Sequence, residues 1–64
     1  MTRDQFRQLH RGQQIRDRQD RRWIVQAAPF EDDGLTRVVI RSGDLVRRVP
    51  GNQADDYEVV MNDR

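Results

Sequence analysis

The sequence predicts an all-β fold, a small five-stranded barrel with a short N-terminal helix. Apolar and polar residues alternate along five short segments of the chain. Turn-forming residues separate these segments at a spacing of about 8–12 residues, which is typical of small β-barrels and sandwiches. The chain has 64 residues, enough for one domain at most. Five short strands in so small a chain favour a closed or nearly closed barrel.

The first segment, residues 2–10, has the pattern of a short helix. Thr2 and Gln5 have the spacing of a capping box. Phe6 and Leu9 are three residues apart and form one narrow apolar stripe. Because an isolated helix of this length is marginal in water, we expect it to dock on the rest of the domain.

Five strands are expected after the helix. The second is the clearest, because it is rich in aromatic and β-branched residues, and we expect Pro29 to stop it. Asp33-Gly34 has the composition of a tight hairpin turn, and Ser42-Gly43 is expected to form the next turn. Asp20 suits the turn between the first two strands. The strands are expected at residues 13–18, 22–28, 35–41, 44–49 and 57–61.

One sequence pattern lies in the expected first hairpin. It runs Gly12-Gln13-Gln14-Ile15-Arg16-Asp17, continues through a polar turn, and ends with Arg22-Trp23-Ile24-Val25. This pattern resembles the opening hairpin of small SH3-like barrels, including Tudor-type and KOW-type domains, and the resemblance extends over residues 12–49. It implies a five-stranded SH3-like barrel and no particular ligand. KOW-type domains usually carry Gly in the first turn, where this chain has Asp20.

The composition limits the function classes. The chain has 12 basic residues, all of them Arg, against 11 acidic residues, which gives a net charge of +1. It has no Cys, which excludes disulfides and thiolate sites. No segment approaches the roughly 18 consecutive apolar residues of a membrane span, and the N-terminal residues contain no apolar leader. We therefore expect a cytoplasmic protein that does not enter a membrane.

Residues suited to catalysis are scarce. His10 is the single His, and its place at the end of the expected helix suits the helix dipole better than a role as a base. No Ser lies beside a base in a recognisable spacing. The acidic runs at 31–33 and 55–56 lack the alternating spacing of a calcium-binding loop. We expect no enzymatic activity, no cofactor, no metal and no small-molecule substrate.

Alternation along the strands divides the apolar residues between two faces. The expected core consists of Trp23, Val25, Ala27, Val38, Ile40, Leu45, Val49, Tyr57, Val59 and Met61. The opposite face carries one apolar residue from each of four strands: Ile24, Val39, Val46 and Val60. Three explanations for this second stripe remain open. The helix covers part of it, or the strong curl of a small barrel makes it unimportant, or it is an interface with a second copy or another protein.

Five Arg side chains are expected to point away from the core: Arg16, Arg18, Arg37, Arg41 and Arg48. Residues two apart on a strand share a face, so these residues would form short basic ladders suited to phosphate groups. The alternative is a mixed, solvated surface on which neighbouring carboxylates pair with the Arg side chains. The carboxylates close enough in the expected layout are Asp17, Asp20, Asp44 and Glu58.

These features predict a non-enzymatic binding module that contacts nucleic acid or a nucleoprotein complex through its outward Arg residues. The alternative is a protein adaptor or inhibitor, of the kind found in phages and mobile elements. Such a protein would bind through Ile24, Val39, Val46 and Val60, together with Phe30 in the loop at residues 29–33. Salt distinguishes the two, because contacts to phosphate weaken steeply as salt is added.

Overall fold

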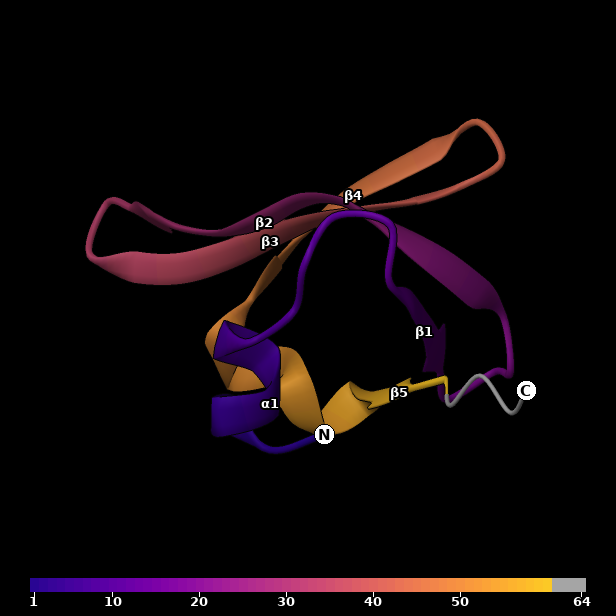
Figure 1. The fold of residues 1–64 in the computed structure, drawn as a ribbon, viewed down its shortest axis with the longest axis horizontal. Coiled ribbons are helices and arrows are strands. Elements are labelled where there is room, and N and C mark those ends of the chain that lie inside the picture. The colour runs from indigo at the N-terminus through magenta and orange to yellow at the C-terminus, as the bar shows by residue number, and fades with distance from the viewer. Residues whose placement is uncertain (61–64) are drawn as a thin grey trace.

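The computed structural model describes residues 1–60 and consists mainly of antiparallel β-strands with one short α-helix (Figure 1). The elements in chain order are α1 (Arg3–Arg7), β1 (Gln14–Asp17), β2 (Arg22–Asp32), β3 (Leu35–Ser42), β4 (Leu45–Pro50), the 3-10 helix η1 (Gly51–Asp56) and β5 (Tyr57–Val59). The all-β prediction with five strands and a short N-terminal helix is confirmed.

All five strands belong to one antiparallel sheet in the order β4-β3-β2-β1-β5. In Figure 1, β2, β3 and β4 run along one side of the molecule, and β1 and β5 lie on another, so the sheet bends around the core. The end strands β4 and β5 do not pair with each other, and the sheet is not closed within residues 1–60. The closed barrel that strand spacing predicts is therefore not confirmed.

Pro29 does not stop β2 as predicted, because two irregularities accommodate it. The pairing of β2 with β3 shifts once between Val25 and Ala27 and again between Ala27 and Phe30. Each shift inserts one extra residue into β2, and a residue within such a bulge leaves the hydrogen-bonded ladder. The pairing of β1 with β2 ends at Ile24, and Gly12 and Gln13 bond only to Val25 beyond it. Within residues 1–60 the other edge of β2 is therefore also free at Pro29. The missing proline N–H therefore costs no strand pairing.

The hairpin turns depend on residues with positive φ. Asp33 and Gly34, with φ of 55° and 79°, connect β2 to β3 and confirm the turn predicted from this dipeptide. The next turn contains Gly43 and Asp44, one residue later than the predicted Ser42-Gly43. Gly43 has a φ of 60°, a conformation that Gly adopts with little cost.

Helix α1 docks on the core, as its length requires. Gln5 N–H donates to Thr2 Oγ1 at 3.1 Å and Thr2 N–H donates to Gln5 Oε1 at 2.9 Å, which confirms the capping box. The helix ends at Arg7, earlier than the predicted residue 10. Phe6 and Leu9 are both buried within the core cluster. The helix therefore packs on the inner face of the sheet, and the explanation that it covers the opposite stripe is wrong.

The core is formed by Phe6, Leu9, Ile15, Trp23, Val25, Val38, Ile40, Val49, Ala54 and Tyr57. Most of the strand residues among them are predicted by alternation alone. The prediction that Leu45 is a core residue is wrong. Leu45 is 50% exposed, because the end of the β3–β4 hairpin projects away from β1, β5 and the helices (Figure 1). Ala27 is half-buried, and Val59 packs against the edge of the core. Met61 lies outside the described residues. Ala54 lies in η1, where alternation gives no signal.

Candidate nucleic-acid interface

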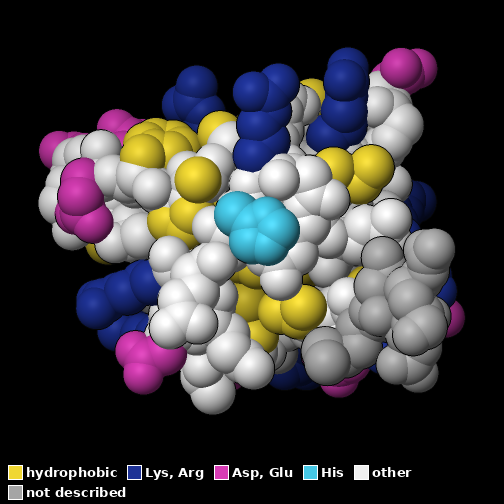
Figure 2. Space-filling view, in the orientation of Figure 1, with side chains coloured by type: hydrophobic (Ala, Val, Ile, Leu, Met, Phe, Trp, Pro, Cys, Tyr) yellow, Lys and Arg dark blue, Asp and Glu magenta, His cyan; other side chains and the backbone are white. Residues whose placement is uncertain are grey.

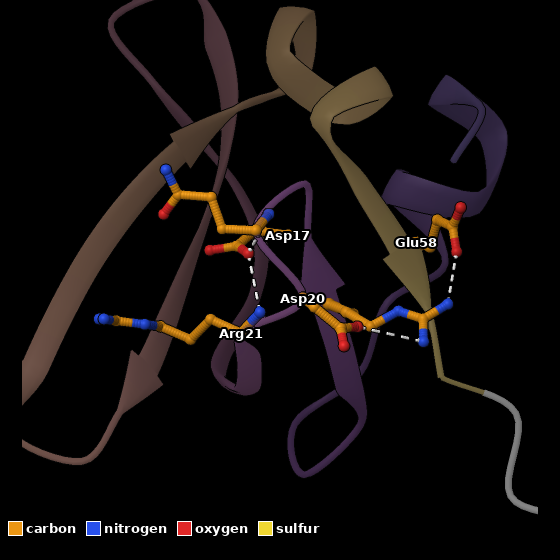
Figure 3. Close-up of polar contacts among 6 residues, drawn as sticks. Asp17, Asp20, Arg21 and Glu58 are labelled. Atoms are coloured by element: carbon orange, nitrogen blue, oxygen red, sulfur yellow. Dashed lines mark hydrogen bonds and ion pairs between the residues drawn. The ribbon is translucent and has the colours of Figure 1, made fainter.

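Arg16 on β1 is held by carboxylates on two sides. Its Nη2 donates to Glu58 Oε2 at 2.9 Å, and its Nη1 lies 3.4 Å from Asp20 Oδ1 (Figure 3). The hydrogen bond to Glu58 is the main reason that the pKa of Arg16 is raised, and the charge of Asp20 adds to it. The same hydrogen bond lowers the pKa of Glu58. The positive charge of Arg16 is therefore already balanced by carboxylates of the same chain.

Arg18, in the turn after β1, is paired in the same way. Its Nε lies 3.0 Å from Asp56 Oδ1. Arg16 and Arg18 border a hollow whose lining also includes five carboxylates, Asp17, Asp20, Asp55, Asp56 and Glu58. The first predicted Arg ladder thus lies in mixed surroundings where acidic residues outnumber basic ones. Here the alternative of a paired, solvated surface describes the structure.

Among residues 1–60, Asp17 forms no ion pair with an Arg side chain, and it acts instead as an acceptor for the first hairpin. Its Oδ2 accepts from Trp23 Nε1 at 3.0 Å, and its Oδ1 accepts from the backbone N–H groups of Gln19 and Arg21, each at 2.9 Å. Figure 3 shows the bond from Arg21. These donors, Trp23 foremost, lower the pKa of Asp17. Asp17 therefore organises the turn and fixes the orientation of the indole.

Arg37 on β3 is also engaged. Its Nε lies 3.3 Å from Asp32 Oδ2, and its side chain is only 27% exposed. A half-buried guanidinium beside a carboxylate has less of its charge available to a partner than a free one. Of the five predicted Arg residues, Arg16, Arg18 and Arg37 are thus paired within the chain.

The remaining two predicted Arg residues share one face with most of the predicted apolar stripe. In the strand register, Arg41 on β3 lies between Ile24 on β2 and Val46 on β4. Two residues away on β3, Val39 lies beside Arg48 on β4. Side chains that are directly opposite across a strand pair project to the same face. We call these five residues the outer patch: Ile24, Val39, Arg41, Val46 and Arg48.

The outer patch is exposed and carries positive charge only. Within residues 1–60, neither Arg41 nor Arg48 forms an ion pair. Ile24 and Val46 are 50% and 53% exposed, and Val39 is half-buried. Along the side formed by β2, β3 and β4, at the top of Figure 2, basic side chains stand apart with hydrophobic side chains between them. The basic and apolar sets, predicted as separate surfaces, form one surface here.

Two residues of the predicted partner-binding set lie away from the outer patch. The N–H of Val60 donates to the Gln14 carbonyl at 3.0 Å, so Val60 is separated from Ile24 by the width of β1. Phe30, predicted to lie in a loop, is part of β2. It is exposed and pairs with Arg37, nearer the tip of the β2–β3 hairpin. The predicted stripe is therefore divided, and only its part on β2, β3 and β4 forms the outer patch.

Arg47 has a role that the sequence interpretation missed. It faces inward beside Ile40, and its guanidinium carbon lies 4.7 Å from the centroid of the Trp23 ring. Its Nη1 donates to Tyr57 Oη at 3.4 Å. Arg47, itself exposed, therefore covers the buried indole from the solvent side. Its position two residues before the inward-facing Val49 is the sequence signal that separates it from Arg48.

The chain matches no known protein family, no curated protein and no solved structure. In the part of the chain that the structure describes, neither helix has the length and apolar character needed to cross a membrane. The outer patch therefore provides the basis for a functional assignment.

Proposed function

We propose that the protein is a non-enzymatic binding module that holds the backbone of a nucleic acid on the outer patch. The observation that carries this proposal is the position of Arg41 and Arg48, which project from one face without a carboxylate partner in residues 1–60. Guanidinium groups match phosphate oxygens bidentately. Such contacts supply most of the affinity of sequence-independent nucleic-acid binding.

The arrangement of the two Arg residues suits neighbouring phosphates of one strand. Arg41 pairs with Val46 and Arg48 pairs with Val39, so the two Arg residues are diagonal neighbours on adjacent strands. Diagonal positions lie about 7–8 Å apart, a distance that two flexible guanidinium side chains can adjust. The apolar side chains between them offer contact area to sugars and bases.

The outer patch contains no aromatic residue, so it has no ring on which a base can stack. Its two Arg side chains would contact the phosphate backbone, which carries no sequence information directly. We therefore expect binding that is sensitive to salt and tolerant of sequence. Arg16, Arg18 and Arg37 contribute less, because their own carboxylate partners compete with phosphate.

We extend the proposal to the fold and assign the chain to the small SH3-like barrels. The strand order supports this assignment: β1 to β4 form a meander, and β5 returns to pair with β1. Asp20 supports it as well. Its φ of 66° lies in the left-handed region, which Gly adopts freely and Asp tolerates. Asp20 therefore replaces the Gly of KOW-type domains while keeping a left-handed backbone conformation.

The second candidate function is an adaptor or inhibitor that binds another protein. The observation that favours it is the exposure of Ile24 and Val46 on the outer patch, which are 50% and 53% exposed. Neighbouring exposed apolar side chains are a feature of protein interfaces. In that case, capture of a partner would survive nuclease treatment and high salt, and Val46→Asp would abolish it.

Fluorescence anisotropy with labelled single-stranded and duplex oligonucleotides tests the proposed function. The affinity is expected to fall with added salt between about 50 and 200 mM. The double variant Arg41→Ala/Arg48→Ala should reduce the slope of log affinity against log salt by roughly 1.4–1.8 units, the contribution of two phosphates.

The matched control is Arg11→Ala/Arg21→Ala. It removes the same charge from exposed Arg residues outside the outer patch, neither of which forms an ion pair in the described residues. It should retain the salt slope of the unmodified protein. Absence of binding at about 50 mM salt, or an equal loss in the control, would exclude the nucleic-acid function.

A further inference from the structure

A hollow of about 280 Å³ lies between α1, the β2–β3 turn and the start of η1. Arg3 and Arg7 line it from the helix, Leu35 from β3, and Gly51 and Asn52 from η1. Basic side chains occupy the space between α1 and the tip of the β2–β3 hairpin in Figure 2. None of the residues that line this hollow belongs to the outer patch.

The charge of this hollow distinguishes it from the hollow beside Arg16. Among residues 1–60, its lining includes two Arg residues and no carboxylate, whereas five carboxylates line the other. Arg3 and Arg7 are four residues apart on α1, so their side chains lie on the same side of the helix. Both are exposed, and neither forms an ion pair within residues 1–60. Their two charges are available to one ligand.

The rest of the lining is largely apolar or neutral. Leu35 is exposed at one wall, and the Phe6 ring lies at the base. Gly51 keeps the space above that ring open, because a Cβ there would lie 3.6 Å from Phe6 Cε2. The Asn52 side chain adds an amide donor and acceptor at the rim. The hollow thus combines a doubly cationic side with an apolar wall.

We propose that this hollow binds a phosphate monoester, with the phosphate between Arg3 and Arg7 and the organic group against Leu35. A phosphate monoester carries about −1.5 to −2 charges at neutral pH, which matches two guanidinium groups, whereas a diester carries only one. The volume lies near the lower end of the range for small-molecule sites, about 300–1,000 Å³. It therefore suits a single ring or one nucleoside rather than a longer chain. This site goes beyond the proposed backbone contacts on the outer patch and does not depend on them.

The test is a titration of the ¹⁵N-labelled protein monitored by backbone amide chemical shifts. The probes are inorganic phosphate, phenyl phosphate, adenosine 5′-monophosphate and the diester adenosine 3′,5′-cyclic monophosphate. Saturable shifts confined to residues 3–7, 34–36 and 51–52 are expected with phenyl phosphate or the monophosphate. Inorganic phosphate should bind more weakly because it lacks the organic group, and the cyclic diester because it carries one charge.

Two variants separate charge from shape. Arg3→Ala/Arg7→Ala should weaken phenyl phosphate binding by about tenfold or more, since two charge-assisted contacts are lost. Gly51→Leu keeps both Arg residues and should block binding by filling the hollow; unchanged melting temperatures verify that both variants fold. Arg11→Ala/Arg21→Ala should bind as the unmodified protein does. The proposal is overturned by the absence of saturable shifts, by shifts at the outer patch instead, or by equally tight binding of the cyclic diester.

Discussion

Trp23 Nε1 donates a hydrogen bond of 3.0 Å to Asp17 Oδ2, which joins the core to the turn of the first hairpin. Trp23 is completely buried, and Asp17 also accepts from two backbone N–H groups of the turn. A buried indole N–H without an acceptor is costly, so this carboxylate is a structural group. The turn that supports β1 and β2 therefore depends on one side chain.

Replacing Asp17 is expected to destabilise the protein. Asp17→Ala removes the acceptor of the Trp23 N–H and the two acceptor contacts of the turn. The urea midpoint, followed by tryptophan fluorescence, should fall clearly below that of the unmodified protein. Asp55→Ala, at an exposed carboxylate of η1, is the control and should change the stability by less than about 0.5 kcal/mol. Equal midpoints for the two variants would contradict the structural role of Asp17.

The lowered pKa values of Asp17 and Glu58 predict how stability depends on pH. A carboxyl group whose pKa is lower in the folded state contributes stability above its unfolded value, near pH 4. This contribution is lost as the pH falls through the folded value. The free energy of unfolding should therefore be steady between about pH 5 and 7 and decrease below about pH 4. Asp17→Asn should show a shallower decrease, and an unchanged pH profile in that variant would contradict the assignment.

Arg47 and Arg48 are adjacent in sequence, yet we expect their replacement to have opposite consequences. Arg47→Ala removes the cation–π contact over Trp23 and should lower the free energy of unfolding by roughly 0.5–1 kcal/mol, with little effect on oligonucleotide affinity. Arg48→Ala should leave the stability within about 0.5 kcal/mol and weaken oligonucleotide binding. Urea unfolding and anisotropy on the same two variants provide the comparison. Loss of binding in both variants would contradict the assignment of the two faces.

Ile40 and Leu45 test the position of the core. Ile40 is completely buried, so Ile40→Val should cost about 0.5–1.5 kcal/mol. Leu45 is half exposed near the end of the β3–β4 hairpin, so Leu45→Ala should cost less than about 0.5 kcal/mol. Chemical denaturation measures both. A larger loss at Leu45 would favour the core predicted from alternation over the observed one.

The strands and most of their inward residues could be predicted because side-chain direction alternates along a strand. Val38, Ile40 and Val49 follow this rule directly. The continuation of β2 through Pro29 could not be predicted in this way, because it depends on two bulges and on a free strand edge. Neither feature is encoded in local composition.

The candidate site was predictable only in part, because strand register decides which charges meet. Arg16 is neutralised by Glu58, which is 42 residues away in sequence and becomes its neighbour only through the pairing of β1 with β5. Arg41 and Arg48 keep their predicted outward direction because alternation alone determines it. The hollow beside α1 combines residues from Arg3 to Asn52, so no local pattern indicates it.

The role of Arg41 and Arg48 in binding nucleic acid is tested by comparing unpaired with paired Arg residues. The salt dependence of oligonucleotide affinity is measured for Arg41→Ala/Arg48→Ala and for Arg16→Ala/Arg18→Ala, which remove equal charge from the chain. We predict that the outer-patch variant loses roughly 1.4–1.8 units of the log–log salt slope, while the variant of the paired Arg residues keeps the slope of the unmodified protein. A full slope in the outer-patch variant, or the same loss in both variants, would show that Arg41 and Arg48 do not hold the nucleic acid.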